Sequence, residues 1–514
     1  MDSTKKNRIN RINNDNGNTK DKTDVKPVTK SEQHHKNSNM ALILTAVSVC
    51  VLFVSMSLFM VIFAKNNKME MFDNSYNTYS YRLAKEYLRG KIYSSDGQLL
   101  AYSEGEEATD QKRVYPYGNM FAHAVGISSH GKMGTEKLAN YYLLNCNLSL
   151  KDKADTEKDD SVPTADSVYT TLDTRLQQVA FDSLGVYKGA VVITEIKTGR
   201  ILAMVSKPDF DPNNIDNEWD SLVADKNNSN LLNRVTQGLY PPGSTFKIIT
   251  TLEYLREHDH SYAGYHFNCG GRFSYEDTTI TCYHGSVHGS VDFPASFAKS
   301  CNSSFANMAT GFDPASYEQT LVDLMFDCEL PCDLPTSVSK TAIEPGVDMH
   351  NLLQASIGQG QDAMSPIHLN MITCAIANEG VLMRPMLLDH VESDSGSHKV
   401  VSFEPKKERQ LITKEESELL TELMTEVVKS GTGKRLQNDL YSSAGKTGSA
   451  EYSNYNKDYS HAWFTGFAPA EEPKIAVTII IEGAGSGGEY AVPIAKRMFD
   501  MYFTQVVDTP VNSE

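Results

Sequence analysis

The longest uninterrupted apolar segment of the chain lies near its N-terminus. No residue from Met40 to Ala64 is charged, and most are Leu, Ile, Val, Phe, Met or Ala. As a helix rising about 1.5 Å per residue, this segment spans about 37 Å, enough to cross the roughly 30 Å hydrocarbon core of a membrane. The pattern predicts a single membrane-spanning helix over 40–64. A cleaved signal peptide is the alternative, but its apolar region is normally only about 7–15 residues long.

Beyond this segment, short β-prone runs and helical periods follow one another. Strands are predicted on both sides of the turn Lys197-Thr198-Gly199, and buried-strand patterns recur over 462–467 and 475–481. Helical patterns dominate the residues between them, from about 244 to 430. Strands at both ends with helices between them predict a mixed α/β domain, in which both ends of the domain build one sheet around a helical insertion.

The region that follows the apolar segment has a different pattern. Ser95-Asp96-Gly97 lies between two β-prone runs, which predicts a hairpin. The charged segment 151–160 has no apolar period and is typical of a linker or exposed loop. We therefore predict a β-rich, membrane-proximal domain over 65–160 and a second domain over 161–507.

Charge is unevenly distributed along the chain. Residues 1–39 contain nine Lys/Arg and five Asp/Glu, a net charge of +4, whereas the whole chain carries −17 and the remainder therefore −21. Basic residues beside a membrane span favour its cytoplasmic side. We expect 1–39 to be a cytoplasmic tail, disordered because it has few large apolar residues, and the rest to be extracytoplasmic. So acidic a chain is not expected to bind nucleic acid.

The chain has eight cysteines, seven of them beyond the apolar segment. An odd number in so large a region does not indicate a disulfide scaffold, although Cys269 and Cys282 are close enough in sequence to pair. With His284 and His288 they also form a group that could bind zinc. The spacing of these residues matches no strong zinc template, and free buried cysteines are common. We therefore predict no metal site.

The sharpest local pattern is Pro241-Pro242-Gly243-Ser244-Thr245-Phe246-Lys247, followed by an apolar helical run. Residues three apart share a helix face, so the Lys247 amine can reach the Ser244 hydroxyl. A serine nucleophile needs a neighbouring base, and a lysine can be that base if burial lowers its pKa. The spacing alone is weak evidence, because Ser-x-x-Lys also begins at Ser3, Ser129, Ser296, Ser337 and Ser443.

Two more motifs follow along the chain. Ser300-Cys301-Asn302 presents a hydroxyl and an amide two residues apart, which by itself suggests only a capped helix end. In Lys446-Thr447-Gly448-Ser449 the lysine would attract a carboxylate, and the two hydroxyls would hydrogen-bond to it. Small residues around this motif allow a ligand or another backbone to approach closely. Alone, it would be an ordinary turn.

Taken together, Ser-x-x-Lys, Ser-x-Asn and Lys-Thr-Gly in this order are the signature set of the penicillin-binding proteins and serine β-lactamases. The motifs are 56 residues apart from Ser244 to Ser300 and 146 apart from Ser300 to Lys446. The chain closely resembles a class B, monofunctional penicillin-binding protein, over nearly everything after residue 39. The resemblance also rests on the segments 89–97, 113–118, 189–211, 233–240, 358–366 and 463–467.

The resemblance implies the penicillin-binding fold, with a central antiparallel sheet and a helical insertion. It further implies a D,D-transpeptidase that cross-links the stem peptides of peptidoglycan without a metal or organic cofactor. Ser244 would attack the penultimate D-Ala carbonyl and form an acyl-enzyme, which an amine of a neighbouring stem peptide would resolve. β-Lactams, which mimic D-Ala-D-Ala, would acylate Ser244 and inhibit the enzyme.

The resemblance also implies roles for the other motif residues. Lys247 would be the base for acylation, although the identity of the base is disputed across this superfamily. Ser300 would relay a proton to the leaving amine, and Asn302 would hold the substrate amide and orient Lys247. The backbone N–H groups of Ser244 and Ser449 would form the oxyanion hole. The terminal carboxylate of the substrate would be bound by Lys446, Thr447, Gly448 and Ser449.

The resemblance leaves partners and rival functions to consider. Residues 65–160 would be the membrane-proximal pedestal of the family and are too few for a glycosyltransferase domain. We therefore expect a separate membrane glycosyltransferase as a partner. Further expected partners are proteins of cell division, or of the cell elongation that determines cell shape. The alternatives are a membrane-tethered β-lactamase, a β-lactam sensor and a non-catalytic scaffold. Glu344-Pro345 lacks the Leu-Asn that a β-lactamase would place after it, and 39 polar residues are too few for a signalling domain.

Overall fold

The computed structural model describes residues 30–67, 71–72, 78–158, 162–454 and 457–507, and the chain divides into two units, 1–71 and 72–514. The first unit contains α1 (Lys30–Asn66), whose segment Asn39–Lys65 has a mean hydropathy of 2.6. This helix is long and apolar enough to cross a membrane, as predicted. The predicted disorder over 1–39 is wrong for Lys30–Asn39, because an existing helix extends at little cost. Residues 1–29 lie outside the described part.

The second unit is built around a five-stranded antiparallel sheet of order β15-β16-β17-β5-β6. β5 and β17 pair in register from Gly189 opposite Ile481 to Glu195 opposite Ile475, so strands from opposite ends of the domain are neighbours. This confirms the predicted sheet built from both ends. The strands are β5 (Gly189–Glu195), β6 (Ile201–Lys207), β15 (Ala444–Asn454), β16 (Lys457–Ala468) and β17 (Ile475–Ile481).

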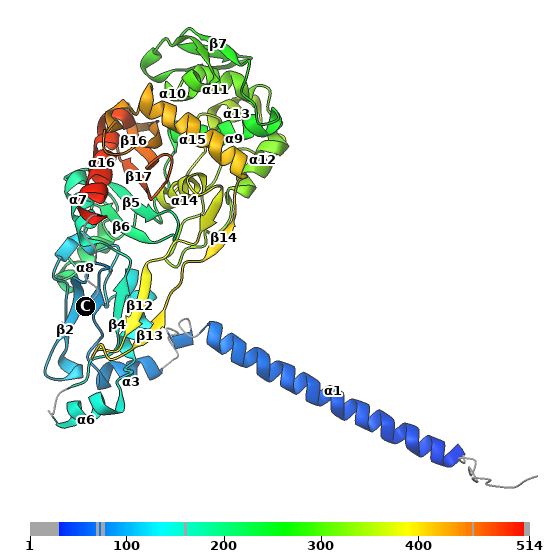
Figure 1. Cartoon of the computed structure of the whole chain (residues 1–514), viewed down its shortest axis with the longest axis vertical. Coiled ribbons are helices and arrows are strands. Elements are labelled where there is room, and N and C mark those ends of the chain that lie inside the picture. Colours follow the sequence, from blue (N-terminus) through cyan, green and yellow to red (C-terminus); the bar gives the residue numbers. More distant parts are fainter. Residues whose placement is uncertain (1–29, 68–70, 73–77, 159–161, 455–456, 508–514) are drawn as a thin grey trace, which may run out of the picture. The chain divides into compact units, whose positions relative to one another are not determined.

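Helices cover both faces of this sheet, because both faces are apolar (Figure 1). α7 (Thr174–Leu184) and α16 (Gly487–Met501) pack on one face and share a buried apolar core with it. α14 (Pro366–Ile376), in which every residue is buried, packs on the other. α9 (Lys247–Glu257) and α15 (Lys414–Lys429) belong to the core on that second side. The result is the mixed α/β arrangement that the sequence predicted.

The helical pattern predicted between about 244 and 430 is interrupted at the Ser-x-Asn motif. α10 (Phe293–Ala298) ends before the Ser-x-Asn motif and α11 (Asn302–Ala309) begins within it. The break lies at Ser300, whose φ of 57° is incompatible with a continuous right-handed helix. Farther along lie α12 (Pro314–Asp323) and α13 (Met349–Ala355).

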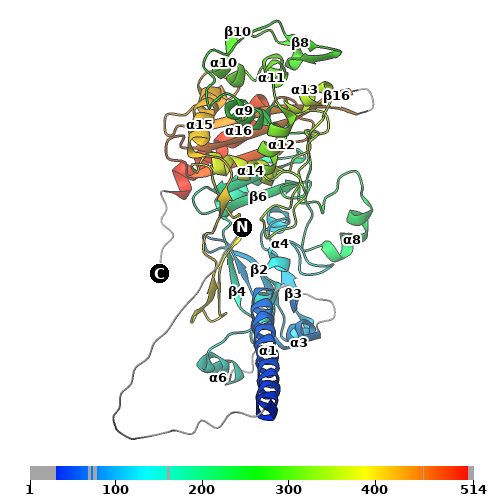
Figure 2. The same cartoon turned by 90° about the vertical axis from the view of Figure 1, so that its right-hand side faces the viewer.

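Four short strands precede α10 and were not predicted. They form two antiparallel pairs, the hairpin of β8 with β9 and the pair of β7 with β10 that encloses it in sequence, and these pack on α10 and α11 (Figure 2). Each has only four residues, so the alternation of polar and apolar positions in β7 (His-Phe-Asn-Cys) and β8 (Arg-Phe-Ser-Tyr) is too short to predict a strand by itself. The strands are β7 (His266–Cys269), β8 (Arg272–Tyr275), β9 (Thr278–Thr281) and β10 (Gly289–Asp292).

A second sheet has the order β13-β12-β4-β1-β2-β3. Its β1–β2 hairpin confirms the turn predicted at Ser95-Asp96-Gly97, and β1 runs parallel to β4. Strands β1 to β3 precede residue 160 and strands β4, β12 and β13 follow it, so the sheet contains strands from both sides of the predicted domain boundary. The boundary itself stays a prediction. The strands are β1 (Ile92–Tyr93), β2 (Leu99–Glu104), β3 (Lys112–Val114), β4 (Ser167–Thr170), β12 (Leu388–Glu392) and β13 (Lys399–Ser402).

The segment predicted as a linker over 151–160 is helical where it is described, in α6 (Leu150–Lys158). Ser149 explains its start, because the hydroxyl of Ser149 accepts a hydrogen bond from the Asp152 backbone N–H at 3.2 Å. The other elements are α3 (Thr78–Glu86), α4 (Gly134–Leu138), α5 (Asn140–Leu144), α8 (Ile215–Ala224), β11 (Val381–Met383) and β14 (Lys407–Gln410).

A buried charge cluster joins the N-terminal segments that carried part of the family resemblance. The Glu136 side chain is fully buried, and its carboxylate accepts hydrogen bonds at 2.6 Å from Nε of Arg89 and from Nε of Arg113. Burial alone would raise the pKa of Glu136, but the charges of Arg113 and Arg89 outweigh it and lower the pKa. Here every buried charge has an opposite partner, which makes the cluster a structural support.

Candidate active site

Ser244 lies in a one-turn 3-10 helix, Gly243–Thr245, which leads directly into α9. This turn packs closely against β15. A Cβ on Gly243, whose φ is 53°, would lie only 2.9 Å from the Ala450 Cα, so the position requires glycine. The Gly243 N–H donates a hydrogen bond to the Gly358 carbonyl at 2.8 Å. The turn therefore presents the Ser244 hydroxyl beside the strand that carries the third motif.

Lys247 is fully buried below Ser244, with its Nζ 3.1 Å from the Ser244 Oγ. Burial lowers its pKa from the ordinary 10.5 to about 8. Its amine also donates to the Asn302 Oδ1 at 2.6 Å and to the Ser300 carbonyl at 2.8 Å. Both of these oxygens can only accept, so in the neutral amine they take the two N–H groups and the lone pair is available to the neighbouring hydroxyls of Ser244 and Ser300.

The Ser-x-Asn motif lies on the opposite wall of the same site. The Ser300 Oγ is 3.3 Å from Nζ of Lys247 and 2.9 Å from Nζ of Lys446, so this hydroxyl lies between two amines. The left-handed conformation of Ser300 turns its side chain away from the path of a helix. The Asn302 amide donates to the Thr281 carbonyl at 3.0 Å, which ties the motif to the β9 hairpin.

The third motif forms part of β15, an edge strand of the main sheet. Lys446 is fully buried, and burial together with the nearby charge of Lys247 holds its pKa well below the usual value. The Thr447 hydroxyl is 2.5 Å from the Thr432 hydroxyl. The Gly487 N–H donates to the Ser449 Oγ at 3.2 Å. Gly448 is needed because a Cβ there would lie 3.0 Å from Thr245 Cγ2 and 3.0 Å from Trp463 Cβ.

The three motifs meet at a cleft of about 450 Å³. Among the described residues that line it are Ser244, Ser300, Asn302, Thr447 and Ser449, and Lys247 and Lys446 lie directly beneath. The structure thus brings together all the site residues predicted from the sequence. A hydroxyl next to an amine of lowered pKa, with a second lysine and further hydroxyl groups nearby, can attack the carbonyl of an anionic peptide or amide.

Some lining residues carried no recognisable sequence signal. Thr432 reaches the cleft from the segment after α15, and Thr281 and Tyr283 reach it from the β9 hairpin. They are brought there by packing between segments distant in sequence, and none belongs to a motif. Glu344, considered for a hydrolase, is exposed, and the carboxylate among the described lining residues is instead that of Glu451.

The Cys/His group predicted from the sequence has a different composition in the structure. Cys269, Cys282 and His288 converge, but the fourth member is Cys301 and not His284. The His284 ring instead packs on Tyr283, with ring centroids 4.1 Å apart. Cys301 is the middle residue of the Ser-x-Asn motif, so this cluster adjoins the cleft.

Comparisons with known proteins agree with this geometry. Residues 189–500 match the model of the penicillin binding protein transpeptidase domain. The peptidoglycan D,D-transpeptidase PbpA of Mycolicibacterium smegmatis is 33% identical over 443 residues, covering 79% of this chain and 87% of that protein. The peptidoglycan D,D-transpeptidase MrdA of Acinetobacter baumannii is 28% identical, covering 78% and 68%.

Solved structures give the same result. Penicillin-binding protein A from M. tuberculosis, in its imipenem acyl-enzyme complex, aligns with a TM-score of 0.72 and 29% identity, covering 81% of this chain and 98% of that chain. The family model spans more than half of the present chain, and the PbpA relative exceeds 30% identity. The chain therefore belongs to the penicillin-binding protein transpeptidase family, as a class B member.

Proposed function

We propose that this protein is a peptidoglycan D,D-transpeptidase that acts through an acyl-enzyme on Ser244. The observation that carries the proposal is the position of Lys247, whose Nζ lies 3.1 Å from the Ser244 Oγ while the Ser300 carbonyl and the Asn302 Oδ1 accept its N–H groups. A buried amine with a pKa of about 8 is neutral in about one molecule in ten at pH 7, far more often than an ordinary lysine. It can therefore remove the proton from Ser244 as the hydroxyl attacks the penultimate D-Ala carbonyl.

The leaving D-Ala amine needs a proton, and Ser300 is placed to supply it. The Ser300 hydroxyl is within hydrogen-bonding distance of both Lys247 and Lys446, so it can donate its own proton and regain one from a lysine. Thr447 and Ser449 line the cleft and Lys446 lies beneath it, and to these three residues we assign the terminal carboxylate of the substrate. Gly448 lets β15 lie close to Thr245 and Trp463. The oxyanion forms between the backbone N–H groups of Ser244 and Ser449.

The same site explains β-lactam inhibition. A β-lactam presents an amide carbonyl and a carboxylate in one small molecule, and opening its ring acylates Ser244 without releasing a leaving group. The acyl-enzyme persists where no base activates water on it. Glu451, the carboxylate among the described lining residues, is exposed and belongs to the outer part of β15, which favours slow hydrolysis over β-lactamase activity.

The anchor sets where this chemistry takes place. The basic residues before the apolar segment, nine in the first 39, favour a cytoplasmic N-terminus and a catalytic domain outside the membrane. Residues 65–160 then act as a pedestal that spaces the cleft from the bilayer. They are too few for a polymerase domain, so a membrane glycosyltransferase supplies the glycan strands, with division or elongation proteins as further partners.

The test is covalent labelling of the full-length protein in detergent with a fluorescent penicillin, read by gel and by intact mass. The native protein should gain one adduct that persists for many minutes, and Ser244→Ala should gain none. The matched control is Ser402→Ala, at an exposed serine of β13 that does not line the cleft, and it should label normally. Rapid drug turnover without a trapped adduct would instead indicate a hydrolase, and adduct formation on Ser244→Ala would refute the nucleophile.

A further inference from the structure

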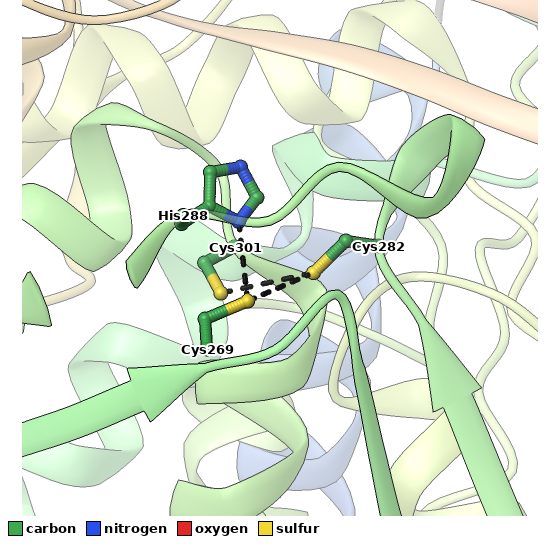
Figure 3. Close-up of side chains that lie close together, drawn as sticks. All are labelled: Cys269, Cys282, His288 and Cys301. Carbon is green, nitrogen blue, oxygen red and sulfur yellow. Dashed lines mark hydrogen bonds between the residues drawn. The ribbon is translucent and has the colours of Figure 1, made fainter. Parts of the chain in front are cut away.

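The side chains of Cys269, Cys282, His288 and Cys301 point toward a common centre (Figure 3). One ligand atom from each of the four residues lies within 4.8 Å of all the others. The three cysteines are at most 2% exposed. Three soft thiols and an imidazole directed at one buried point are the ligand set that zinc prefers.

The distances between these atoms fit a tetrahedral ion. With Zn–S bonds of about 2.3 Å and a Zn–N bond of about 2.0–2.1 Å, tetrahedral geometry puts two sulfurs about 3.8 Å apart and a sulfur and a nitrogen about 3.6 Å apart. The Sγ atoms of Cys269 and Cys282 are 3.7 Å apart, and those of Cys282 and Cys301 are 3.8 Å apart. The Cys269 Sγ is 3.4 Å from the His288 Nδ1. These three distances match those of an occupied site, and all the remaining pairs lie within 4.8 Å.

Backbone N–H groups prepare the sulfurs to carry negative charge. The N–H groups of Gly271, Ser303 and Ser304 donate to the sulfurs of Cys269, Cys282 and Cys301, at 3.4, 3.5 and 3.4 Å respectively. Hydrogen bonds of this kind stabilise thiolates, which are the metal-binding form of cysteine. Each of the three sulfurs receives one, which a cluster of neutral thiols would not require.

A disulfide between Cys269 and Cys282 is the competing explanation. It would use two of the sulfurs and would leave no reason for Cys301 and the His288 nitrogen to face the same point. It would also leave the N–H groups of Ser303 and Ser304 beside neutral sulfurs. A single metal ion accounts for all four side chains and for the backbone donors.

We propose that Cys269, Cys282, His288 and Cys301 bind one structural zinc ion, which fixes the strands β7 to β10 to the Ser-x-Asn motif. Binding releases the three thiol protons and leaves the ion without an open position, so it takes no part in acyl transfer. Its effect on the cleft comes through Cys301, which lies between Ser300 and Asn302. Thr281, next to Cys282, accepts the hydrogen bond from Asn302, so the ion holds both sides of this contact.

The experiment measures metal content by plasma mass spectrometry in the full-length protein, purified in detergent without chelators. We expect about one zinc per chain in the native protein and a loss of most of it in Cys282→Ser and in His288→Ala. Matched controls are His284→Ala, from the same loop, and Cys328→Ser, an exposed thiol outside the cluster. Both controls should retain zinc. Thermal unfolding of each variant reports whether it folds.

A second measurement uses only the native protein, in case the cysteine variants do not fold. Removing the metal with a chelator should make three further thiols reactive to a chromogenic thiol reagent. Cobalt exchanged into the site should show the intense visible bands of a tetrahedral ion with thiolate ligands. Metal removal should also slow penicillin acylation by about 10–100-fold, because Ser300 and Asn302 lose their fixed position.

Three results would overturn the proposal. The first is native protein free of metal whose mass shows a Cys269–Cys282 disulfide. The second is zinc content unchanged in folded Cys282→Ser and His288→Ala. The third is stoichiometric iron or copper in place of zinc. None of these outcomes depends on catalytic activity, so they are independent of the assignment of Ser244 as the nucleophile.

Discussion

Two buried charged clusters in this protein have opposite designs. In the N-terminal cluster, Glu136 is held between Arg89 and Arg113, and the pKa of its carboxyl is lowered because opposite charges outweigh burial. In the cleft, Lys247 and Lys446 are equally buried, and their hydrogen-bond partners among the described residues are hydroxyls, an amide and carbonyls. Their pKa values are lowered because burial disfavours the charged amine.

The difference separates a structural role from a chemical one. A compensated charge stays ionised over the working pH range and its removal leaves its partners unpaired in the interior. An uncompensated buried amine becomes neutral near physiological pH and can accept a proton. Burial alone therefore does not identify a catalytic group, whereas burial without an opposite charge does point to one.

The largest expected effect is on the chemistry of the cleft. Lys247→Met keeps the length of the side chain and removes its lone pair, so the acylation rate constant for penicillin should fall by about 10²–10⁴-fold. Stopped-flow or quenched labelling of the full-length protein measures it. Lys429→Met, at a lysine whose side chain is 77% exposed, is the matched control and should label at the native rate. A decrease of less than about tenfold would exclude Lys247 as the main base.

The next largest effect is on stability and concerns the buried cluster of Glu136, Arg89 and Arg113. Glu136→Gln removes one buried charge and leaves two arginines unpaired, so the free energy of unfolding should fall by about 3–5 kcal/mol. Denaturant unfolding of the purified protein measures it. Glu86→Gln breaks the exposed pair with Arg82 and should cost less than about 0.5 kcal/mol. Equal losses of unfolding free energy in the two variants would mean that the buried cluster stabilises the protein no more than an exposed ion pair does.

The stability contributed by Glu136 should also depend on pH in a defined direction. Its pKa is lowered in the folded state, so the contribution is complete above the unfolded value near 4.5 and is lost as the pH falls through the lower folded value. The stability difference between native protein and Glu136→Gln should therefore shrink in acid. A difference that grows below about pH 4 would contradict the sign of this pKa shift.

A third effect is the pH dependence of acylation. The active form of Lys247 is the neutral amine, so the acylation rate should rise about tenfold per pH unit below about 8 and level off above it. Penicillin labelling at a series of pH values measures the profile, and Glu136→Gln should leave the midpoint unchanged. A rate that is constant from about pH 6 to pH 10 would show that no amine titrates in this step.

The smallest expected effect concerns Thr432, a cleft residue that no sequence motif indicated. Thr432→Val removes the hydroxyl that lies 2.5 Å from Thr447, so Thr447 loses a fixed orientation toward the substrate carboxylate. Second-order acylation should fall by about 3–10-fold, the value of one hydrogen bond. The midpoint of the pH profile should stay at the native value, because Thr432 is a positioning residue and does not contact Lys247. A shifted midpoint would contradict this role.

Local patterns in the sequence were enough to predict much of the fold. The hydrophobic run over 40–64 predicted the apolar helix, apolar runs on both sides of the Lys197 turn predicted the β5–β6 hairpin, and the two terminal strand runs predicted the common sheet. These signals depend on residues close in sequence, which is why they could be recognised without the structure. The helix over 150–158 and the short strands β7 to β10 were missed, because weak local preference is settled there by capping and packing.

The membrane-spanning pattern, the α/β class and the motif residues were recognisable from the sequence alone, because periodicity and spacing are properties of the covalent chain. The lowered pKa values of Lys247 and Lys446 could be recognised only in the folded protein, since a pKa depends on burial and on neighbours from distant segments. The fold also places Cys301, and not His284, as the fourth member of the cysteine cluster. The members of a ligand set are decided by where their side chains point in space. The left-handed turn at Ser300 places Cys301 beside Cys269, Cys282 and His288.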